Sequence, residues 1–475
     1  MKKIIITTII ILIHFLGLAQ DSNCNCNTVF DDLIQKLETN YIGFAQMENP
    51  EKITAYNQRK KEFKDIVSKT QGENCTALLQ KFLSYFKDGH LFVYEQPKYS
   101  EKELAKFKLE IKENKVNTNA LMNTLDLEKN WIEKSRLDGI IGTWTDGQSE
   151  FVIIKDEGYY KAYVLNSKLE SIDSGELKAQ FKATEIGFEG MFYSDNYTPR
   201  FAEGNMYKEG ALLVFTGANY WGKLEPENKR EIAMLNKQEV NLPTIQKLDD
   251  ENTLFSIPSF LVDSEKFFKV LMDNIDLLKN TKNLIFDIRA NVGGNAIYMS
   301  FLESYATRPL ESSQGLVLAS EETKQYFERL AKNSPEVYEP VVKAIETNMG
   351  KIVDGPKYPE KIFPPSEFNI NNVAILMDEG CMSAAESFIL HSKSASSKVT
   401  TFGTNTAGVI DYTSVNTINL KSGNQNIYFG YPTSTYHKNI PENGYNNGGI
   451  TPDVPIKSKV EDKVQYIINY YKQRN

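Results

Sequence analysis

The spacing of hydrophobic positions near the N-terminus is that of helices. Between residues 75 and 86 the apolar side chains recur at steps of three and four, which places them on one buried helix face. Glycine is a natural C-terminal cap, so we expect this helix to end at Gly89 and to deliver His90 just beyond its end. Residues 20–95 are therefore predicted to form a helical domain.

The pattern then changes from helical to β-rich. Residues 96–134 are rich in Lys and Glu and are predicted to be a helical linker. In FVIIKDEGYYKAYVL, residues 151–165, two β-rich runs flank Asp156-Glu157-Gly158, which is typical of a hairpin. We predict a small antiparallel β domain over residues 135–245, either a barrel or a sandwich, with the GTW triplet at 142–144 near its start.

Seven aromatic residues of this β domain have two possible roles. They can line a binding surface or pack in the domain core, and core packing is the commoner fate of such side chains. These residues are Tyr159, Tyr160, Tyr163, Phe192, Tyr193, Tyr220 and Trp221.

From about residue 250 the chain alternates strands and helices. NLIFDI (283–288) and NVAILMD (372–378) are short, continuously apolar runs, as expected of strands buried on both faces of a sheet. A helical pattern over residues 264–280 lies before the first of these strands. Residues 250–475 are therefore predicted to form an α/β domain, and the whole chain a multidomain α+β protein.

The first residues, 1–19, are predicted to be a signal peptide. Lys2 and Lys3 precede an apolar run over residues 4–18, and Gly17-Leu18-Ala19 offers the small residues that a signal peptidase recognises. A membrane anchor is the alternative, but the run is shorter than the ~20 apolar residues that a span needs. We expect export to the periplasm or the exterior, without stable membrane insertion after cleavage.

Composition narrows the classes of function. A chain of 475 residues predicts two or three domains. Its formal net charge of −8 offers no basic surface for nucleic acid, so nucleic acid is not expected as a partner.

Cys75 is expected to form a disulfide with either Cys24 or Cys26, as suits an oxidising compartment. A C-x-C pair without a second pair or a histidine nearby is a poor metal site, so no metal is expected.

Two loops at strand ends carry candidate chemistry, because the carboxyl ends of such strands open into the crevice of an α/β domain. RANVGG (289–294) holds two glycines, which let backbone N–H groups approach a ligand but also fit a simple tight turn. DEGCMSAAESF (378–388) places Ser383 at a helix N-terminus, where N–H groups favour a developing negative charge. Ser383 with Glu386 also fits a capping box, so the serine is either a nucleophile or a helix cap.

A serine nucleophile needs a base, and the chain after the signal peptide has three histidines. His391 follows Ser383 by eight residues on the same predicted helix, roughly 12 Å along its axis, and cannot reach the hydroxyl. His437 lies in a Lys/Asn-rich loop, and His90 follows a helix end. Residue type and spacing alone do not choose between these two.

Four segments within residues 250–456, in the right order and spacing, resemble the C-terminal processing peptidase family of serine peptidases, which includes the tricorn core. The segments are LIFDIRANVGGN (284–295), VAILMDEGCMSAAESF (373–388), TFGTNTAG (401–408) and NGGITPDVPI (447–456). The resemblance implies a spiral, crotonase-like α/β catalytic domain that cleaves peptide or protein substrates through an acyl-enzyme, without a cofactor.

The resemblance also indicates which base is used. Processing peptidases proper use a lysine just after the third segment, where this chain has Val409. The tricorn-like branch takes a histidine from an N-terminal helical domain in a D-G-H motif, which KDGHLF (87–92) matches. The resemblance therefore implies His90 as the general base for Ser383 and Glu442 as the residue that orients it.

By the same resemblance, the backbone N–H groups of Gly293 and Ala384 form the oxyanion hole. Two features depart from the family pattern: Gly89 stands where the branch commonly has a serine, and no PDZ module is recognisable, its place being taken by the β-rich stretch. Two other functions stay open. One is a non-catalytic ligand- or peptide-binding protein on the same fold, and the other is an esterase.

Overall fold

The computed structural model divides the chain into two compact units. The smaller unit comprises Met1–Phe86, His90–Lys98 and Val415–Thr433, and the larger unit Lys87–Gly89, Tyr99–Ser414 and Ser434–Asn475. The residues that the structure describes are 25–70, 75–96, 98–128, 138–184, 187–215, 219–225, 239–422, 426–438, 444–446, 448–457, 460 and 462–474. The predicted signal peptide lies outside them.

Helices dominate the smaller unit. They are α1 (Cys26–Asn40), α2 (Ile42–Ala45), α3 (Pro50–Val67) and α4 (Cys75–Leu83). Asn side chains just before α1 and α3 accept hydrogen bonds from the first backbone N–H groups of each helix. A disulfide joins Cys26 to Cys75, so Cys26 is the partner among the two that the sequence left open.

Helix α4 ends earlier than the sequence predicts. It is followed by a 3₁₀ turn, η2 (Ser84–Phe86), and by Lys87 in the left-handed conformation with a φ of 51°. The predicted cap at Gly89 is wrong. Glycine at this position instead permits a close approach, because an ideal Cβ on Gly89 would lie 2.8 Å from Cγ2 of Val409, within the larger unit.

The smaller unit also contains a segment that is far away in sequence. Strand β1 (Phe92–Glu95) pairs antiparallel with β18 (Ile427–Thr435), with Phe92 opposite Gly430. The carboxylate of Asp32 in α1 accepts the backbone N–H of Lys421 at 2.8 Å. The stretch 415–433, which the sequence pattern assigned to the α/β domain, therefore packs with the N-terminal helices.

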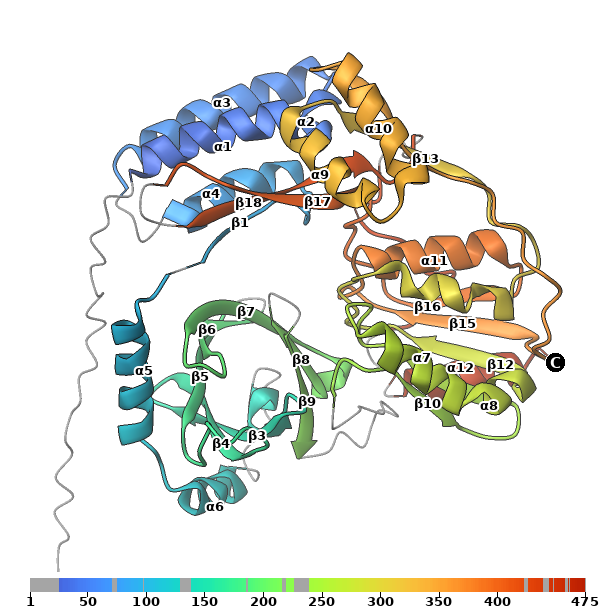
Figure 1. Ribbon diagram of the computed structural model, residues 1–475. Helices are drawn as coiled ribbons and strands as arrows, with labels where there is room; N and C mark the ends of the chain where they lie inside the picture. The colour runs from blue at the N-terminus through green and yellow to red at the C-terminus, as the bar shows by residue number, and fades with distance from the viewer. Residues whose placement is uncertain are drawn as a thin grey trace, which may run out of the picture. The chain divides into compact units, whose positions relative to one another are not determined.

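Of the two predicted β architectures, the structure has the barrel. Its strands are β2 (Gly142–Thr145), β3 (Ser149–Asp156), β4 (Tyr159–Ser167), β5 (Leu177–Ala183), β6 (Phe188–Tyr193), β7 (Pro199–Tyr207), β8 (Leu212–Phe215) and β9 (Asn219–Glu225). Neighbouring strands pair antiparallel, and β2 pairs with β9 to close the ring (Figure 1). The predicted hairpin joins β3 to β4, with Glu157 and Gly158 at φ of 48° and 83°, as a two-residue turn requires.

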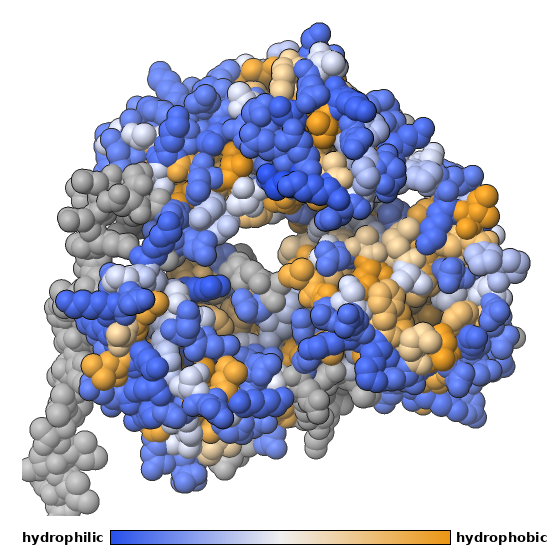
Figure 2. All heavy atoms as spheres, viewed as in Figure 1, coloured by the Kyte–Doolittle hydropathy of each residue, from blue (hydrophilic) through white to orange (hydrophobic). Residues whose placement is uncertain are grey.

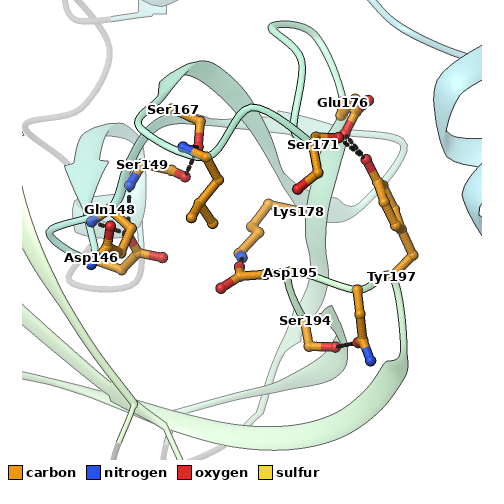
Figure 3. Close-up of polar contacts among 12 residues, drawn as sticks. Asp146, Gln148, Ser149, Ser167, Ser171, Glu176, Lys178, Ser194, Asp195 and Tyr197 are labelled. Atoms are coloured by element: carbon orange, nitrogen blue, oxygen red, sulfur yellow. Dashed lines mark hydrogen bonds and ion pairs between the residues drawn. The ribbon is translucent and has the colours of Figure 1, made fainter.

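Aromatic side chains fill the barrel core. The ring of Trp221 lies 4.5 Å from that of Phe151 and 4.8 Å from that of Phe215, centroid to centroid. Tyr160 is also buried in this core, and Tyr163 and Phe192 pack against it while partly buried. Tyr220 is buried in a separate cluster with Leu212 and Ala290. Polar side chains hold the loops, among them the ion pair between Lys178 and Asp195 (Figure 3).

A six-stranded sheet forms the centre of the α/β part, in the order β10-β11-β12-β15-β16-β19. Its strands are β10 (Thr244–Lys247), β11 (Asn252–Ser256), β12 (Asn283–Asp287), β15 (Asn372–Met377), β16 (Val399–Gly403) and β19 (Val454–Pro455). All neighbours pair parallel except β10 with β11. The two apolar runs predicted as buried strands, β12 and β15, lie side by side, with Asp287 opposite Leu376.

Helices cover both faces of this sheet. On one face Phe286 and Ile375 pack in a cluster with α7 (Ser264–Asp273), α8 (Ile275–Asn280) and α11 (Ala384–Ala395). On the other face, alternate residues of the same strands pack against α12 (Lys463–Lys472). This two-sided burial explains why the strands are continuously apolar rather than alternating.

Of the remaining α-helices and strands of the larger unit, α5 (Glu101–Glu113) and α6 (Thr118–Glu128) precede the barrel in sequence, and the others lie between strands of the six-stranded sheet. These others are β13 (Ser313–Leu318), α9 (Glu321–Ala331), α10 (Pro335–Thr347), β14 (Ile352–Tyr358) and the start of β17 (Tyr412–Asn419). The face seen in Figure 2 is largely hydrophilic, with hydrophobic residues in small groups. Among the helices that the structure describes, none is long and apolar enough to span a membrane.

Candidate active site

Ser383 stands at a strained turn between a strand and a helix. Strand β15 ends at Met377, and α11 begins at Ala384 directly after the serine. Ser383 has a φ of 52° and a ψ of −115°, a conformation that costs a residue with a Cβ on the order of 1–3 kcal/mol. Such strain persists only where the surroundings impose it, and it concentrates at functional sites, so it marks this serine as the candidate nucleophile.

Glu386 holds the serine in this conformation. Its buried carboxylate accepts the N–H of Ser383 at 3.1 Å, which is the glutamate half of the predicted capping box. It also accepts the N–H groups of Gly408 and Val409 at 2.9 and 2.8 Å, and the hydroxyl of Thr406 at 2.5 Å. With four donors the carboxylate is saturated, so it positions the turn rather than transferring protons. The spacing of Ser383 and Glu386 predicted only a capping role for the glutamate and did not indicate this link to the third segment.

Asp378 links the serine loop, residues 378–383, to the glycine loop, residues 289–294. Its Oδ1 accepts the N–H of Gly380 at 3.0 Å within its own loop and that of Ala290 at 2.8 Å in the other. Burial raises the pKa of Asp378 to about 6, against the opposing effects of these hydrogen bonds and of nearby Arg289. This side chain is one of the links between the two loops, together with the hydrogen bond from the N–H of Met382 to the carbonyl oxygen of Asn291 at 3.0 Å.

The glycine loop lies directly against the serine. An ideal Cβ on Gly293 would be 2.8 Å from the carbonyl oxygen of Met382, 2.9 Å from Cβ of Ser383 and 3.0 Å from the amide nitrogen of Ala384. Gly293 also has a φ of 96°, which side chains disfavour. Both facts exclude any residue but glycine at this position without movement of the loops.

The two residues predicted for the oxyanion hole are thus brought together with Ser383. Ala384 is the first residue of α11, a position whose N–H has no partner inside its own helix. The N–H of Gly293 donates to Oδ1 of Asn291 at 2.9 Å. The oxyanion hole stays a prediction, and it requires the Gly293 N–H to be shared with, or released by, Asn291.

Of the histidines considered as the base, His391 is hydrogen-bonded to two tyrosines. His391 lies in α11, where its Nε2 is 2.8 Å from the hydroxyl of Tyr436 and its Nδ1 is 3.1 Å from that of Tyr298. Burial lowers the pKa of His391 to about 4, which keeps the ring neutral. Its two ring nitrogens are thus engaged by tyrosines, which agrees with its exclusion as the base.

The lysine position of the processing peptidases is occupied by an apolar side chain. Val409 is 9% exposed, and its carbonyl oxygen accepts the N–H of Ser383 at 3.2 Å. His90 is partly buried and belongs to the smaller unit, whereas Gly89, one residue earlier, belongs to the larger one. Glu442 lies outside the described residues. The roles of His90 and Glu442 stay predictions.

Metal ligands were not expected. Among the residues that the structure describes, no three His, Cys, Asp or Glu side chains form a group that could hold a metal ion. Cys381 in the serine loop is buried and donates from Sγ to the carbonyl oxygen of Ile288 at 3.0 Å. Burial raises the pKa of this thiol well above its usual value, so it is a weak nucleophile.

Comparisons with known proteins show what the chain resembles. Residues 253–456 match the family model described as Peptidase family S41. Among solved structures, the chain is similar to a putative peptidase from Parabacteroides merdae ATCC 43184, with 12% identity, a TM-score of 0.45 and coverage of 94% of this chain and 97% of that one. Mature CPAF gives 14% identity, a TM-score of 0.46 and coverage of 94% and 97%. The tricorn protease gives 11% identity, a TM-score of 0.42 and coverage of 95% of this chain and 37% of that one.

A search of curated protein sequences finds no significant match. A serine on a strained strand-to-helix turn, with a glycine loop against it, is typical of serine hydrolases built on an α/β sheet. The family match is more specific. Residues 253–456 resemble peptidase family S41, and the chain is a serine peptidase.

Proposed function

We propose that this chain is an exported serine peptidase that cleaves peptide bonds through an acyl-enzyme on Ser383, with His90 as general base. The observation that carries the proposal is the packing of Gly293 against Ser383 and Ala384 at a serine whose backbone is strained. This arrangement brings a hydroxyl, a helix N-terminus and a glycine loop to one point. Acyl transfer needs these three features together.

The position of Gly89 supports His90 as the base. Gly89 approaches Val409, and Val409 in turn accepts the N–H of Ser383. Consecutive Cα atoms are 3.8 Å apart, so the backbone of His90 begins one residue from this contact. Because the lysine position holds valine, the chain itself offers no Ser/Lys alternative there.

In the proposed reaction, His90 accepts the proton of Ser383 as the Oγ atom attacks the peptide carbonyl carbon. The C–N bond then breaks, and His90 returns the proton to the leaving amine. Water hydrolyses the ester on Ser383 by the same route. The N–H groups of Gly293 and Ala384 stabilise the oxyanion, and Glu442 orients His90.

Labelling with a fluorophosphonate probe tests this proposal. We expect the secreted, purified protein to be labelled, and Ser383→Ala and His90→Ala to abolish the labelling. His437→Ala is the matched control and should be labelled like the wild type. Labelling that survives in His90→Ala but is lost in His437→Ala would reverse the assignment of the base. Mass spectrometry of the same secreted protein tests export, with an N-terminus at Gln20 expected.

A further inference from the structure

A short connection of the barrel contacts the end of strand β12, just before the glycine loop. Between β7 and β8 the chain makes a 3₁₀ turn, η5 (Lys208–Gly210), in which Lys208 has a φ of 50°. The Lys208 side chain is fully buried, and its Nζ lies 3.3 Å from Oδ2 of Asp287. Taking a lysine out of water is costly, and a buried ion pair is weak evidence for stability, so this residue calls for another explanation.

Asp287 connects Lys208 to the glycine loop. It is the last residue of β12, and its carboxylate also accepts two hydrogen bonds from Arg289, from Nε at 2.9 Å and from Nη2 at 2.8 Å. Burial alone would raise the pKa of Asp287, but the charges of Arg289 and Lys208 hold it well below its usual range. One carboxylate thus bridges a cation of the barrel and a cation of the loop that carries Gly293.

The residue before Lys208 contacts the other loop. An ideal Cβ on Gly380 would lie 2.6 Å from Cε1 of Tyr207 and 2.8 Å from Cα of Ala290. Ala290 also packs in one apolar cluster with Leu212 and other residues of β8 and β9. The barrel therefore contacts the serine loop through Tyr207, the end of β12 through Lys208, and Ala290 of the glycine loop through β8 and β9.

We propose that Lys208 is a positioning residue for the peptidase reaction, which fixes the glycine loop against Ser383 through Asp287 and Arg289. The proposal rests on the proposed function of Ser383. It makes the barrel a fixed part of the catalytic support rather than a detachable module. A small displacement of the loop has a large effect, because misplacing a reacting group by ~1 Å can cost about 100-fold in rate.

The substitution Lys208→Met tests this role while keeping the length and apolar stem of the side chain. It leaves the pair of Asp287 with Arg289 intact, so it creates no unpaired buried charge. The matched control is Lys178→Met, since Lys178 is another buried barrel lysine, 4% exposed and 2.9 Å from Asp195 (Figure 3). This ion pair joins β5 to the loop after β6, so both of its residues belong to the barrel.

For Lys208→Met we expect kcat for a fluorogenic peptide to fall about 10- to 100-fold, with KM within about 2-fold of the wild type. Fluorophosphonate labelling of Ser383 should slow by a similar factor. Lys178→Met should keep the wild-type kcat even if its melting temperature falls as much as that of Lys208→Met. Lys208→Arg should restore part of the rate, because it restores the charge facing Asp287.

Two results separate this proposal from the one on which it rests. Wild-type protein that is not labelled at Ser383 overturns both proposals. Labelled wild type with an unchanged kcat in folded Lys208→Met overturns only the role of Lys208. Should Lys208→Met not fold, Tyr207→Leu replaces it, since that change removes the ring that lies against Gly380. Wild-type kcat in Tyr207→Leu would then refute the positioning role.

Discussion

Replacing Gly293 by alanine would add one methyl group at the most crowded point of the site. The new Cβ would lie 2.8 to 3.0 Å from three atoms of residues 382–384, two of them backbone atoms. Optimal contacts between non-bonded carbons are ~3.5–4.0 Å, so the two loops would have to separate by roughly 0.5–1 Å. The φ of 96° adds backbone strain, which for a residue with a Cβ is on the order of 1–2 kcal/mol.

These two effects have different consequences, which makes the prediction testable. The strain lowers the free energy of unfolding, whereas the separation of the loops displaces the predicted oxyanion donors from Ser383. Loss of one such donor costs about 100- to 1,000-fold in kcat, or ~2.7–4 kcal/mol of transition-state stabilisation. We therefore expect Gly293→Ala to lower kcat about 100-fold while the protein remains folded.

Gly350→Ala is the matched control. Gly350 also has a positive φ, of 80°, but nothing lies within 4 Å of its ideal Cβ. This variant carries the strain without the collision, so its melting temperature should fall and its kcat should not. Peptide hydrolysis, fluorophosphonate labelling and thermal unfolding are measured on both variants. A Gly293→Ala protein with the kcat of Gly350→Ala would refute the reasoning, because the loops would then tolerate the methyl group without loss of function.

Two further predictions concern stability. Because the pKa of His391 is lowered to about 4 in the folded protein, the unfolded chain binds a proton there first as the pH falls. Up to about 3 kcal/mol of stability should be lost between pH ~6.5 and ~4. Urea unfolding should show a smaller loss over this range in His391→Gln, and equal slopes would contradict the prediction. The disulfide spans 49 residues of sequence, so Cys75→Ser should lower the unfolding free energy by about 4 kcal/mol. An unchanged urea midpoint in Cys75→Ser would contradict this estimate, and reduced wild type serves as its control.

The sequence predicts those elements whose cause is local. Continuous apolar runs mark β12 and β15 because both faces of each strand are covered by helices. Asp156-Glu157-Gly158 marks the β3–β4 hairpin because the turn needs a residue that tolerates a positive φ. The serine segment likewise shows its strand, turn and helix from the sequence alone.

Features that depend on distant contacts could not be predicted in this way. Gly89 has the pattern of a helix cap, yet its glycine is explained by Val409, which is 320 positions later in the printed sequence. Lys208 follows a β-rich run and has the pattern of a solvated turn residue, although it is buried against Asp287. No periodicity or spacing rule connects such pairs, because each partner satisfies an ordinary local role on its own.

The loops of the site are held to one another by carboxylates rather than by apolar packing alone. Asp378 accepts N–H groups from both the serine and the glycine loop, and Glu386 links the serine turn to Gly408 and Val409. Asp453 in the last segment accepts the N–H of Thr401 at the third. Backbone N–H groups have fixed positions, so a carboxylate that accepts several of them holds the loops together. The same hydrogen bonds favour the charged form of the carboxylate, against the effect of burial. This explains why the first two segments contain acidic residues, Asp287 and Glu386, at fully buried positions where a charge would otherwise be disfavoured. These bonds support the strained conformation of Ser383, so the proposed reactivity of this serine depends on acidic side chains that take no part in proton transfer.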